Sequence, residues 1–289
     1  MNIKAIYQRM NQFEKVWLLV FSTIILATTV YFSYGSTKWD SPWSVILNWV
    51  ISPVSALTGV VCVVLCAKGH IDNWIWGLVN SVTYGAVAWA SGYYGDWMLN
   101  WFFFIPTQII IYFAWRKNTS SFGIVNIKKI KPIYIVAFFV SAALMIFILT
   151  KILLGVDSWF INAWKRNATV YTNLAAMFGL KNLGPFLDAT TVVLQIFAEI
   201  FLITRLAQQW PLWFATNVAS IIIWLAVIIT DKTSYGYAIP TLVMWIAYLV
   251  NSLYGNIVWF KKPITSSNIG GGIPKGKIVS LSGYSHTGN

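Results

Sequence analysis

Long apolar runs alternate with short polar segments along most of this chain. The runs cover roughly Val16–Tyr34, Trp49–Ala67, Trp74–Ala90, Met98–Trp115, Pro132–Leu154, Pro185–Leu206, Pro211–Ile229 and Ile239–Phe260. As a helix, each is long enough to cross a hydrocarbon core of about 30 Å. The weak alternation in short segments that is typical of a transmembrane β-barrel is absent. The pattern predicts an all-α polytopic membrane protein with eight transmembrane helices.

Between the fifth and sixth runs, the segment from Gly155 to Gly184 contains "TVYTNLAAMFGL". Its apolar spacing predicts a short helix that lies on the membrane surface without crossing it. The Ser- and Gly-rich C-terminal segment is expected to be disordered. We therefore divide the chain into an N-terminal tail with one extra transmembrane helix (1–44), a first three-helix repeat (45–117), a basic loop with a linking helix and the interfacial segment (118–184), a second three-helix repeat (185–262) and a C-terminal tail (263–289).

Composition supports the membrane class, with 10% charged and 58% hydrophobic residues. The net charge of +12 does not indicate nucleic-acid binding, because the basic residues lie in loops and tails between the apolar runs. Lys and Arg concentrate on the cytoplasmic side of membrane proteins. The loop "RKNTSSFGIVNIKKIK" after the fourth run is therefore predicted to be cytoplasmic. Eight spans then place both termini in the cytoplasm.

A short motif occurs twice. Trp76 and Trp213 are 137 residues apart, as are Asn80 and Asn217, and each pair reads Trp-x-x-x-Asn at the predicted cytoplasmic start of a span. Each copy lies in the middle of three closely connected spans. Four spans separate equivalent positions, so the two triplets are predicted to point the same way through the bilayer. Transporters built from such repeats bind substrate near the midplane between the halves.

Polar and aromatic residues share helix faces in both copies. Trp210, Trp213 and Asn217 fall on one face of the seventh span, and Trp76, Asn80 and Tyr84 belong to the matching stripe of the third. Aromatic faces beside amides suit a flat, polar, heterocyclic ligand. Two alternatives stay open: tryptophans at the start of a span often anchor it at the membrane interface, and the asparagines could form hydrogen bonds between helices.

Other spans add further candidates. Asn100 and Gln108 share a face of the fourth span, which Pro106 is expected to kink. Gln195 and Glu199 are four residues apart near the centre of the sixth span. An ionisable residue at that depth points to a function, so Glu199 is either a proton-coupling site or part of a buried interhelical bond. Asp188 is either a helix cap or a gating residue.

Catalytic chemistry is poorly supplied. His70 lies in a short loop, His286 lies in the tail, and Cys62 and Cys66 are expected to be core residues of an apolar helix. The tail sequence around Gly276 and Lys277 lacks the Ser or Thr of a phosphate-binding loop. We expect no enzyme activity, no metal site and no cofactor.

The segments "GLVNSVTYGAVAW", "MLNWFFF…Q", "DATTVVLQ" and "WPLWFATN" together resemble the PnuC family of bacterial vitamin transporters, over about residues 45 to 260. The resemblance implies a three-one-three helix arrangement similar to that of SWEET sugar transporters. It also implies a homotrimer in the bacterial inner membrane and facilitated diffusion of nicotinamide riboside, a vitamin B3 precursor of NAD. Relatives carry thiamine or riboflavin.

Carried onto this chain, the resemblance indicates a set of ligand contacts: Trp210, Trp213, Asn217, Asn80, Asn100 and Gln108. Net uptake would depend on trapping through phosphorylation by a cytoplasmic nicotinamide riboside kinase. Three alternatives stay open: transport of thiamine, proton-coupled transport through Glu199, and a receptor that binds a metabolite without moving it.

Overall fold

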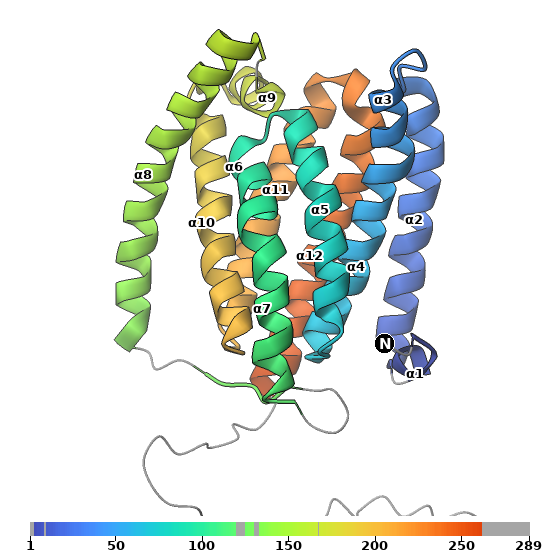
Figure 1. Ribbon diagram of the computed structural model, residues 1–289, viewed down its shortest axis with the longest axis vertical. Helices are drawn as coiled ribbons and strands as arrows, with labels where there is room; N and C mark the ends of the chain where they lie inside the picture. The colour runs from blue at the N-terminus through green and yellow to red at the C-terminus, as the bar shows by residue number, and fades with distance from the viewer. Residues whose placement is uncertain (1–2, 9, 120–124, 130–132, 167, 262–289) are drawn as a thin grey trace, which may run out of the picture.

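The computed structural model describes residues 3–8, 10–119, 125–129, 133–166 and 168–261, which form a bundle of helices (Figure 1). The helices are α1 (Ile3–Gln8), α2 (Gln12–Ser36), α3 (Pro42–Ile46), η1 (Leu47–Ile51), α4 (Ser52–Lys68), α5 (Asn73–Ser91), α6 (Tyr94–Met98), η2 (Leu99–Phe104), α7 (Ile105–Arg116), α8 (Ile133–Trp164), α9 (Thr169–Phe178), α10 (Leu183–Ile203), α11 (Gln209–Thr230), η3 (Lys232–Ser234) and α12 (Tyr235–Lys261). Extended pairing in these ranges is limited to two isolated bridges. The predicted tail 263–289 lies outside the described residues.

Seven helical segments of the described chain are long and apolar enough to cross a membrane. The predicted third span corresponds to α5, which is not one of these seven. Its polar residues, among them Asn73, Asn80 and Ser81, lower its hydropathy. It nevertheless packs along α4 inside the bundle (Figure 1). The multi-pass helical fold is confirmed, while the number of eight spans stays a prediction.

Several predicted boundaries need correction. The second and eighth spans begin at Pro42 and Lys232, ahead of the predicted starts at Trp49 and Ile239. The fifth helix, α8, continues to Trp164, ten residues past the predicted end at Leu154, because its last turns pack against α6, where the rings of Phe160 and Tyr94 are stacked with centroids 4.5 Å apart. The fourth helical segment begins at Tyr94 instead of Met98, so it includes Asp96. The predicted span began after Asp96, because a charged residue normally ends an apolar run. In the structure, Asp96 is fully buried and hydrogen-bonded. A short helix, α9, is present where the sequence predicts one, and its position on the membrane surface stays a prediction.

Two helices widen just before a proline. Leu47–Ile51 and Leu99–Phe104 are π-helical, and Pro53 and Pro106 follow in the first turn of α4 and α7. A proline cannot donate a backbone hydrogen bond to the preceding turn, which favours this local rearrangement. The irregularity expected at Pro106 is thus a π-helical segment, and such segments are frequent at functional sites.

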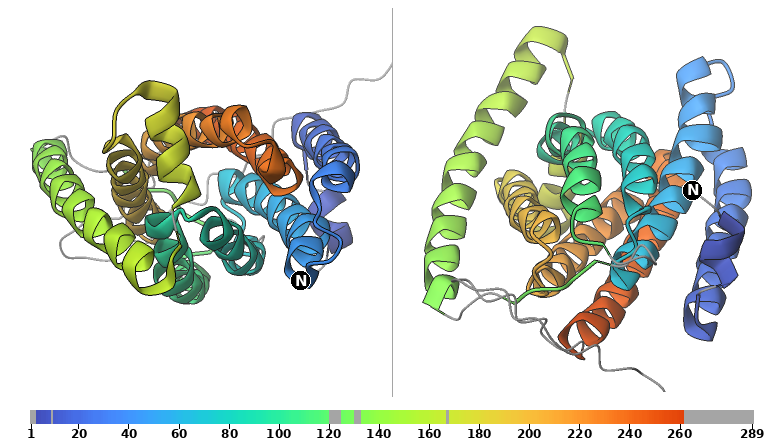
Figure 2. Two further views of the ribbon diagram at one scale, coloured as in Figure 1. Left: turned by 90° about the horizontal axis from the view of Figure 1, so that it is seen from above. Right: turned by 60° about the horizontal axis from the view of Figure 1, so that its bottom comes forward.

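The centre of the bundle is formed by α4, α5, α7, α10, α11 and α12, while α2 and α8 lie at opposite edges (Figure 2). The most apolar windows of α2 and α8 are only 22% and 11% buried in the chain. α1 and the end of α12 lie at the same end of the bundle (Figure 1). That end also holds the turn between α4 and α5 and the turn between α10 and α11.

These two turns have the same backbone geometry. Gly69 follows α4 with φ 73°, and Arg205 follows α10 with φ 64°. In each turn an amide two or more residues past the helix bonds back to it: His70 N–H to the Leu65 carbonyl at 2.8 Å and Leu206 N–H to the Phe201 carbonyl at 2.7 Å. This is the C-terminal cap of a helix that ends in a left-handed residue. The same cap also ends α5, where Gly92 has φ 67° and Tyr93 N–H bonds to the Ala88 carbonyl at 2.9 Å, so it is not specific to the predicted repeat.

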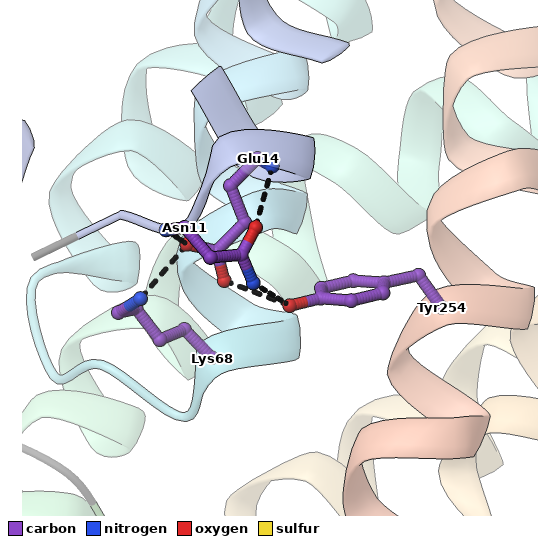
Figure 3. A network of polar contacts seen from close by, with 4 residues as sticks. All are labelled: Asn11, Glu14, Lys68 and Tyr254. Atoms are coloured by element: carbon purple, nitrogen blue, oxygen red, sulfur yellow. Dashed lines mark hydrogen bonds and ion pairs between the residues drawn. The ribbon is translucent and has the colours of Figure 1, made fainter. Parts of the chain in front are cut away.

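The first long helix is tied to the bundle by a polar network near its start (Figure 3). Asn11 and Glu14 form a capping box at the N-terminus of α2. The Glu14 carboxylate also accepts hydrogen bonds from Lys68 Nζ at 2.8 Å and from the Tyr254 hydroxyl at 2.9 Å. Since Glu14 is buried, these contacts fix α2 against the ends of α4 and α12.

Candidate functional site

A large cavity lies between the two groups of helices that the sequence predicts as repeats. Its empty volume is about 790 Å³, which includes space open to the surroundings. The lining residues come from α4 and α5, from η2 and α7, and from α10, α11 and α12. α2 and α8 contribute none of them.

Most of the candidate residues from the sequence meet in this cavity. Those that line it are Asn80, Tyr84, Asn100, Gln108, Gln195, Glu199, Trp210, Trp213 and Asn217. They lie on five different segments, so the sequence stripes converge on one space. Trp76 and Asp188 do not line it.

The two matched asparagines differ in their contacts. Asn80 Nδ2 donates to the Ser55 carbonyl at 2.8 Å, and its Oδ1 accepts from the Tyr248 hydroxyl at 3.3 Å. Asn80 therefore joins α5 to α4 and α12, as in the alternative reading of an interhelical bond. Asn217 is 2% exposed, and its buried Oδ1 has no hydrogen-bond partner among the described residues. An acceptor that the protein leaves unsatisfied is available to a ligand.

Two tryptophans of α11, Trp210 and Trp213, line the cavity. Trp213 is partly exposed, donates from Nε1 to Gln209 Oε1 at 3.3 Å and lies 6.4 Å from the Phe104 ring. Trp210 is buried, and its Nε1 has no partner in the described chain. Its ring lies directly over Gly255, where an added Cβ would come within 2.5 Å of ring carbons. Gly255 is thus required for the close approach of α11 to α12.

Glu199 lies on the wall of the cavity and is 1% exposed. Its Oε1 accepts hydrogen bonds from Thr107 Oγ1 and Gln108 Nε2, both at 3.0 Å. The interhelical bond that we considered from the sequence is therefore present between α7 and α10. Gln108 in turn lies over Gly77, where a Cβ would come within 2.4 Å of Gln108 Oε1.

Asp96 is a buried acid that the sequence reasoning missed. Gln195 Nε2 donates to its Oδ1 at 2.7 Å. Gln195 itself lines the cavity, so Asp96 lies directly behind the wall and positions that amide. The signal in the sequence was the acid of the pair Gly95–Asp96 beside an aromatic run. The predicted start of the fourth span at Met98 left this pair in a loop.

Asp188 caps a helix, but not its own. Its Oδ2 accepts from the Gly95 backbone N–H of α6 at 2.8 Å and from the Tyr171 hydroxyl of α9 at 2.5 Å. Burial and the nearby Asp188 carboxyl raise the pKa of Tyr171 well above its usual value, so the phenol stays a donor. Asp188 therefore ties α9 to the start of α6, at the end of the bundle away from the α4–α5 turn (Figure 1).

Trp76 faces away from the cavity. It packs against the core beside α1 and α2 and lines a smaller apolar space with Tyr7, Met10 and Leu65. Asn73, Gly77 and Asn80 face the cavity from one side of α5. Trp76 directly precedes Gly77, so the helix turns its side chain about 100° away from that side. The two repeats thus place their matched tryptophans differently.

Several lining residues were not candidates from the sequence. α12 adds Met244, Trp245, Tyr248, Asn251 and Ser252, and α4 adds Cys62 and Cys66. The spacing of Trp245, Tyr248 and Ser252 is the same kind of polar-aromatic stripe that identified α11. Both cysteines are free thiols. Among the described residues, no three His, Cys, Asp or Glu side chains are grouped to hold a metal ion.

The fold defines the chain as a multi-pass α-helical membrane protein, with a central cavity that polar and aromatic side chains line. The family model described as nicotinamide mononucleotide transporter matches residues 49–261. The chain therefore belongs to the PnuC transporter family, as the sequence motifs predicted. These relatives are named as transporters, which confirms the expectation that the chain is not an enzyme.

Individual relatives agree with this assignment. The chain is 31% identical to the nicotinamide riboside transporter PnuC of Neisseria mucosa, over 87% of this chain and 82% of that protein. It is 28% identical to the Haemophilus influenzae protein of the same name, over 86% and 90% of the two chains. It also matches the crystal structure of a vitamin B3 transporter PnuC with a TM-score of 0.64 and 27% identity, covering 89% of this chain and 94% of that one.

Proposed function

We propose that this protein carries nicotinamide riboside across the bacterial inner membrane by facilitated diffusion. The observation that carries the proposal is the central cavity, in which the aromatic rings of α11 lie beside polar atoms without protein partners. Within the described part of the chain, Trp210 Nε1 has no acceptor, and Gln108 Oε1 and Asn217 Oδ1 have no donor. A pyridine ring with a carboxamide and a ribose supplies both kinds of group, and its ring can stack on tryptophan.

The lining favours a nucleoside over a nucleotide. None of the residues that line the cavity is Lys, Arg or His, and one of them, Glu199, is an acid. Phosphate groups in proteins are normally bound by Arg or Lys or by helix N-termini. A mononucleotide would therefore place its phosphate near a carboxylate without a compensating cation. The family model is described by the mononucleotide, while the relatives are named for the riboside, and the charge of this cavity supports the riboside.

The transport cycle that we infer is a rocking of the two helix triplets about the bound nucleoside. α4, α5 and α7 lie on one side of the cavity, and α10, α11 and α12 lie on the other. Net uptake would come from phosphorylation by a cytoplasmic kinase, since a phosphorylated product fits the acidic cavity poorly. We also propose that the protein is a homotrimer with both termini in the cytoplasm, which light scattering on the detergent-solubilised protein and accessibility of terminal tags would check.

Uptake into proteoliposomes that contain no kinase tests this function. We expect labelled nicotinamide riboside to equilibrate across the membrane without accumulating, and an imposed pH gradient to leave the final level unchanged. Thiamine and nicotinamide mononucleotide serve as competitors in the same assay. Accumulation that follows the pH gradient would contradict facilitated diffusion. Stronger competition by thiamine than by unlabelled riboside would contradict the proposal that nicotinamide riboside is the substrate. Binding without any flux would indicate a receptor.

A further inference from the structure

The central cavity contains a carboxylate for which the described part of the chain provides no cation. Glu199 is 1% exposed and lines the cavity. Across the described residues, the ion pair that the structure shows is between Lys68 and Glu14, at the start of α2. Glu199 is held only by neutral donors, Thr107 and Gln108, and both contact the same oxygen, Oε1. A buried carboxylate without a counter-charge is costly in a low-dielectric environment.

The second oxygen of Glu199 is available to a ligand. Both hydrogen bonds from the protein end on Oε1, so Oε2 accepts none from the described residues. Gly77 contributes to this arrangement, because it leaves room for the Gln108 side chain that holds Oε1. The carboxylate is thus oriented by α7 while one oxygen stays unused.

The other groups around the cavity have the same electrostatic preference. Gln108 Oε1 and Asn217 Oδ1 are acceptors to which no described residue donates a hydrogen bond. The aromatic rings on the wall belong to Tyr84, Phe104, Trp210, Trp213, Trp245 and Tyr248. The face of an aromatic ring carries partial negative charge and attracts cations. A cationic ring inserted here would meet aromatic faces, carbonyl oxygens and one carboxylate.

We propose that Glu199 is the counter-charge for a positively charged heteroaromatic ring of the substrate, and that it selects this charge over an uncharged ring of the same shape. The inference rests on the proposed function, because it assigns a role within the same cavity. It gives Glu199 a function in substrate binding, instead of in proton coupling. Thr107 and Gln108 are positioning residues that hold the carboxylate for the ligand.

The test compares two ligands that differ in ring charge. Nicotinamide riboside carries a fixed positive charge on its pyridine ring, and its 1,4-dihydro form is uncharged and of nearly equal size. Affinities are measured by calorimetry on purified protein in detergent, for the wild type, Glu199→Gln, Glu199→Asp and Thr107→Val. Glu199→Gln keeps the size and an oxygen for Thr107 and Gln108 but removes the charge. Glu199→Asp keeps the charge.

In the wild type we expect the cationic form to bind more tightly. Glu199→Gln should weaken its binding on the order of tenfold and change the affinity for the neutral form by less than about twofold, since a charge-assisted contact is lost. Glu199→Asp should retain the preference for the cation. Thr107→Val keeps the carboxylate, so it should also retain that preference.

Two results would overturn the inference while leaving the proposed function intact. One is an equal loss of affinity for both ligands in Glu199→Gln, which would show a structural role. The other is an unchanged affinity of Glu199→Gln for both ligands, which would show that the charge contributes nothing to binding. If the wild type bound neither form of the riboside, the proposed function itself would fail.

Discussion

Gln195 on α10 donates a 2.7 Å hydrogen bond to the carboxylate of Asp96 on α6, which is fully buried beside the central cavity. One side chain thus lines the site, and the other supports it from behind. Because Asp96 lies inside a segment long and apolar enough to cross the membrane, its polar atoms depend on neighbouring helices for partners.

Replacement of Gln195 by Leu should destabilise the protein, since it leaves the Asp96 oxygen without this donor. We expect the free energy of unfolding to fall by about 1–3 kcal/mol, the usual cost of an unsatisfied buried polar group. Thermal unfolding in detergent measures the change. Thr190→Val is a matched control, because the Thr190 hydroxyl bonds only to the carbonyl of its own helix at Phe186. Equal stability of Gln195→Leu and the wild type would show that this hydrogen bond contributes nothing.

Trp213→Ala should weaken binding of nicotinamide riboside roughly 5- to 150-fold, the effect of losing one stacking or cation–π partner of 1–3 kcal/mol. Trp213→Phe should restore most of the affinity, because the indole N–H is already used by Gln209. Calorimetry on monodisperse protein measures both. If Trp213 only anchored the helix at the interface, the alanine variant would lose stability while its folded fraction bound normally.

The matched asparagines should respond differently to removal. Asn217→Ala should lower the affinity for the substrate with little effect on stability, because Asn217 Oδ1 accepts no hydrogen bond from the residues that the structure describes. Asn80→Ala should lower the melting temperature, because it breaks the contacts to Ser55 and Tyr248. Parallel binding and unfolding measurements on both variants separate the two effects. Identical behaviour of the two variants would contradict this asymmetry of the repeats.

Gly255→Ala should reduce substrate affinity although Gly255 does not line the cavity. The new methyl group would come within 2.5 Å of the Trp210 ring, which must then move into the site or push α12 away. Gly35→Ala on α2 is the control, since nothing lies within 4 Å of its added Cβ. Both variants are compared by riboside binding. An affinity of Gly255→Ala equal to that of Gly35→Ala would show that the contact relaxes without affecting Trp210.

The turn between α11 and α12 should show a pH-dependent contribution to stability. Burial raises the pKa of Asp231, but hydrogen bonds from Ser234 and Thr233 outweigh this effect and hold the pKa below its usual value. A lowered native pKa stabilises the fold above the unfolded value of about 4, and this contribution is lost as the pH falls through the native pKa. Asp231→Asn should therefore melt below the wild type at neutral pH, and the difference should shrink on acidification. A difference that stayed constant down to pH values of about 3 would contradict this role.

The sequence by itself determined the class of protein and most of the candidate site. Apolar runs such as Gln12–Ser36 and Gln209–Thr230 are helical because a chain in lipid must satisfy its own backbone hydrogen bonds. The stripes that carry Asn217, Gln108 and Glu199 were visible because helix periodicity places such residues on one face. The motifs that contain them also indicated the family that the comparisons confirm.

Only the tertiary structure decided what each polar residue contacts. A repeat in sequence made Asn80 and Asn217 equivalent, but packing against α4 and α12 uses the amide of Asn80 and leaves Asn217 Oδ1 free of protein partners. Trp76 was excluded from the site by the rotation of α5 about its axis, and Asp96 was tolerated in a helix because Gln195 comes from another one. Such contacts join residues far apart in the chain. They depend on how helices are rotated and packed, and hydropathy and spacing along one helix do not contain that information.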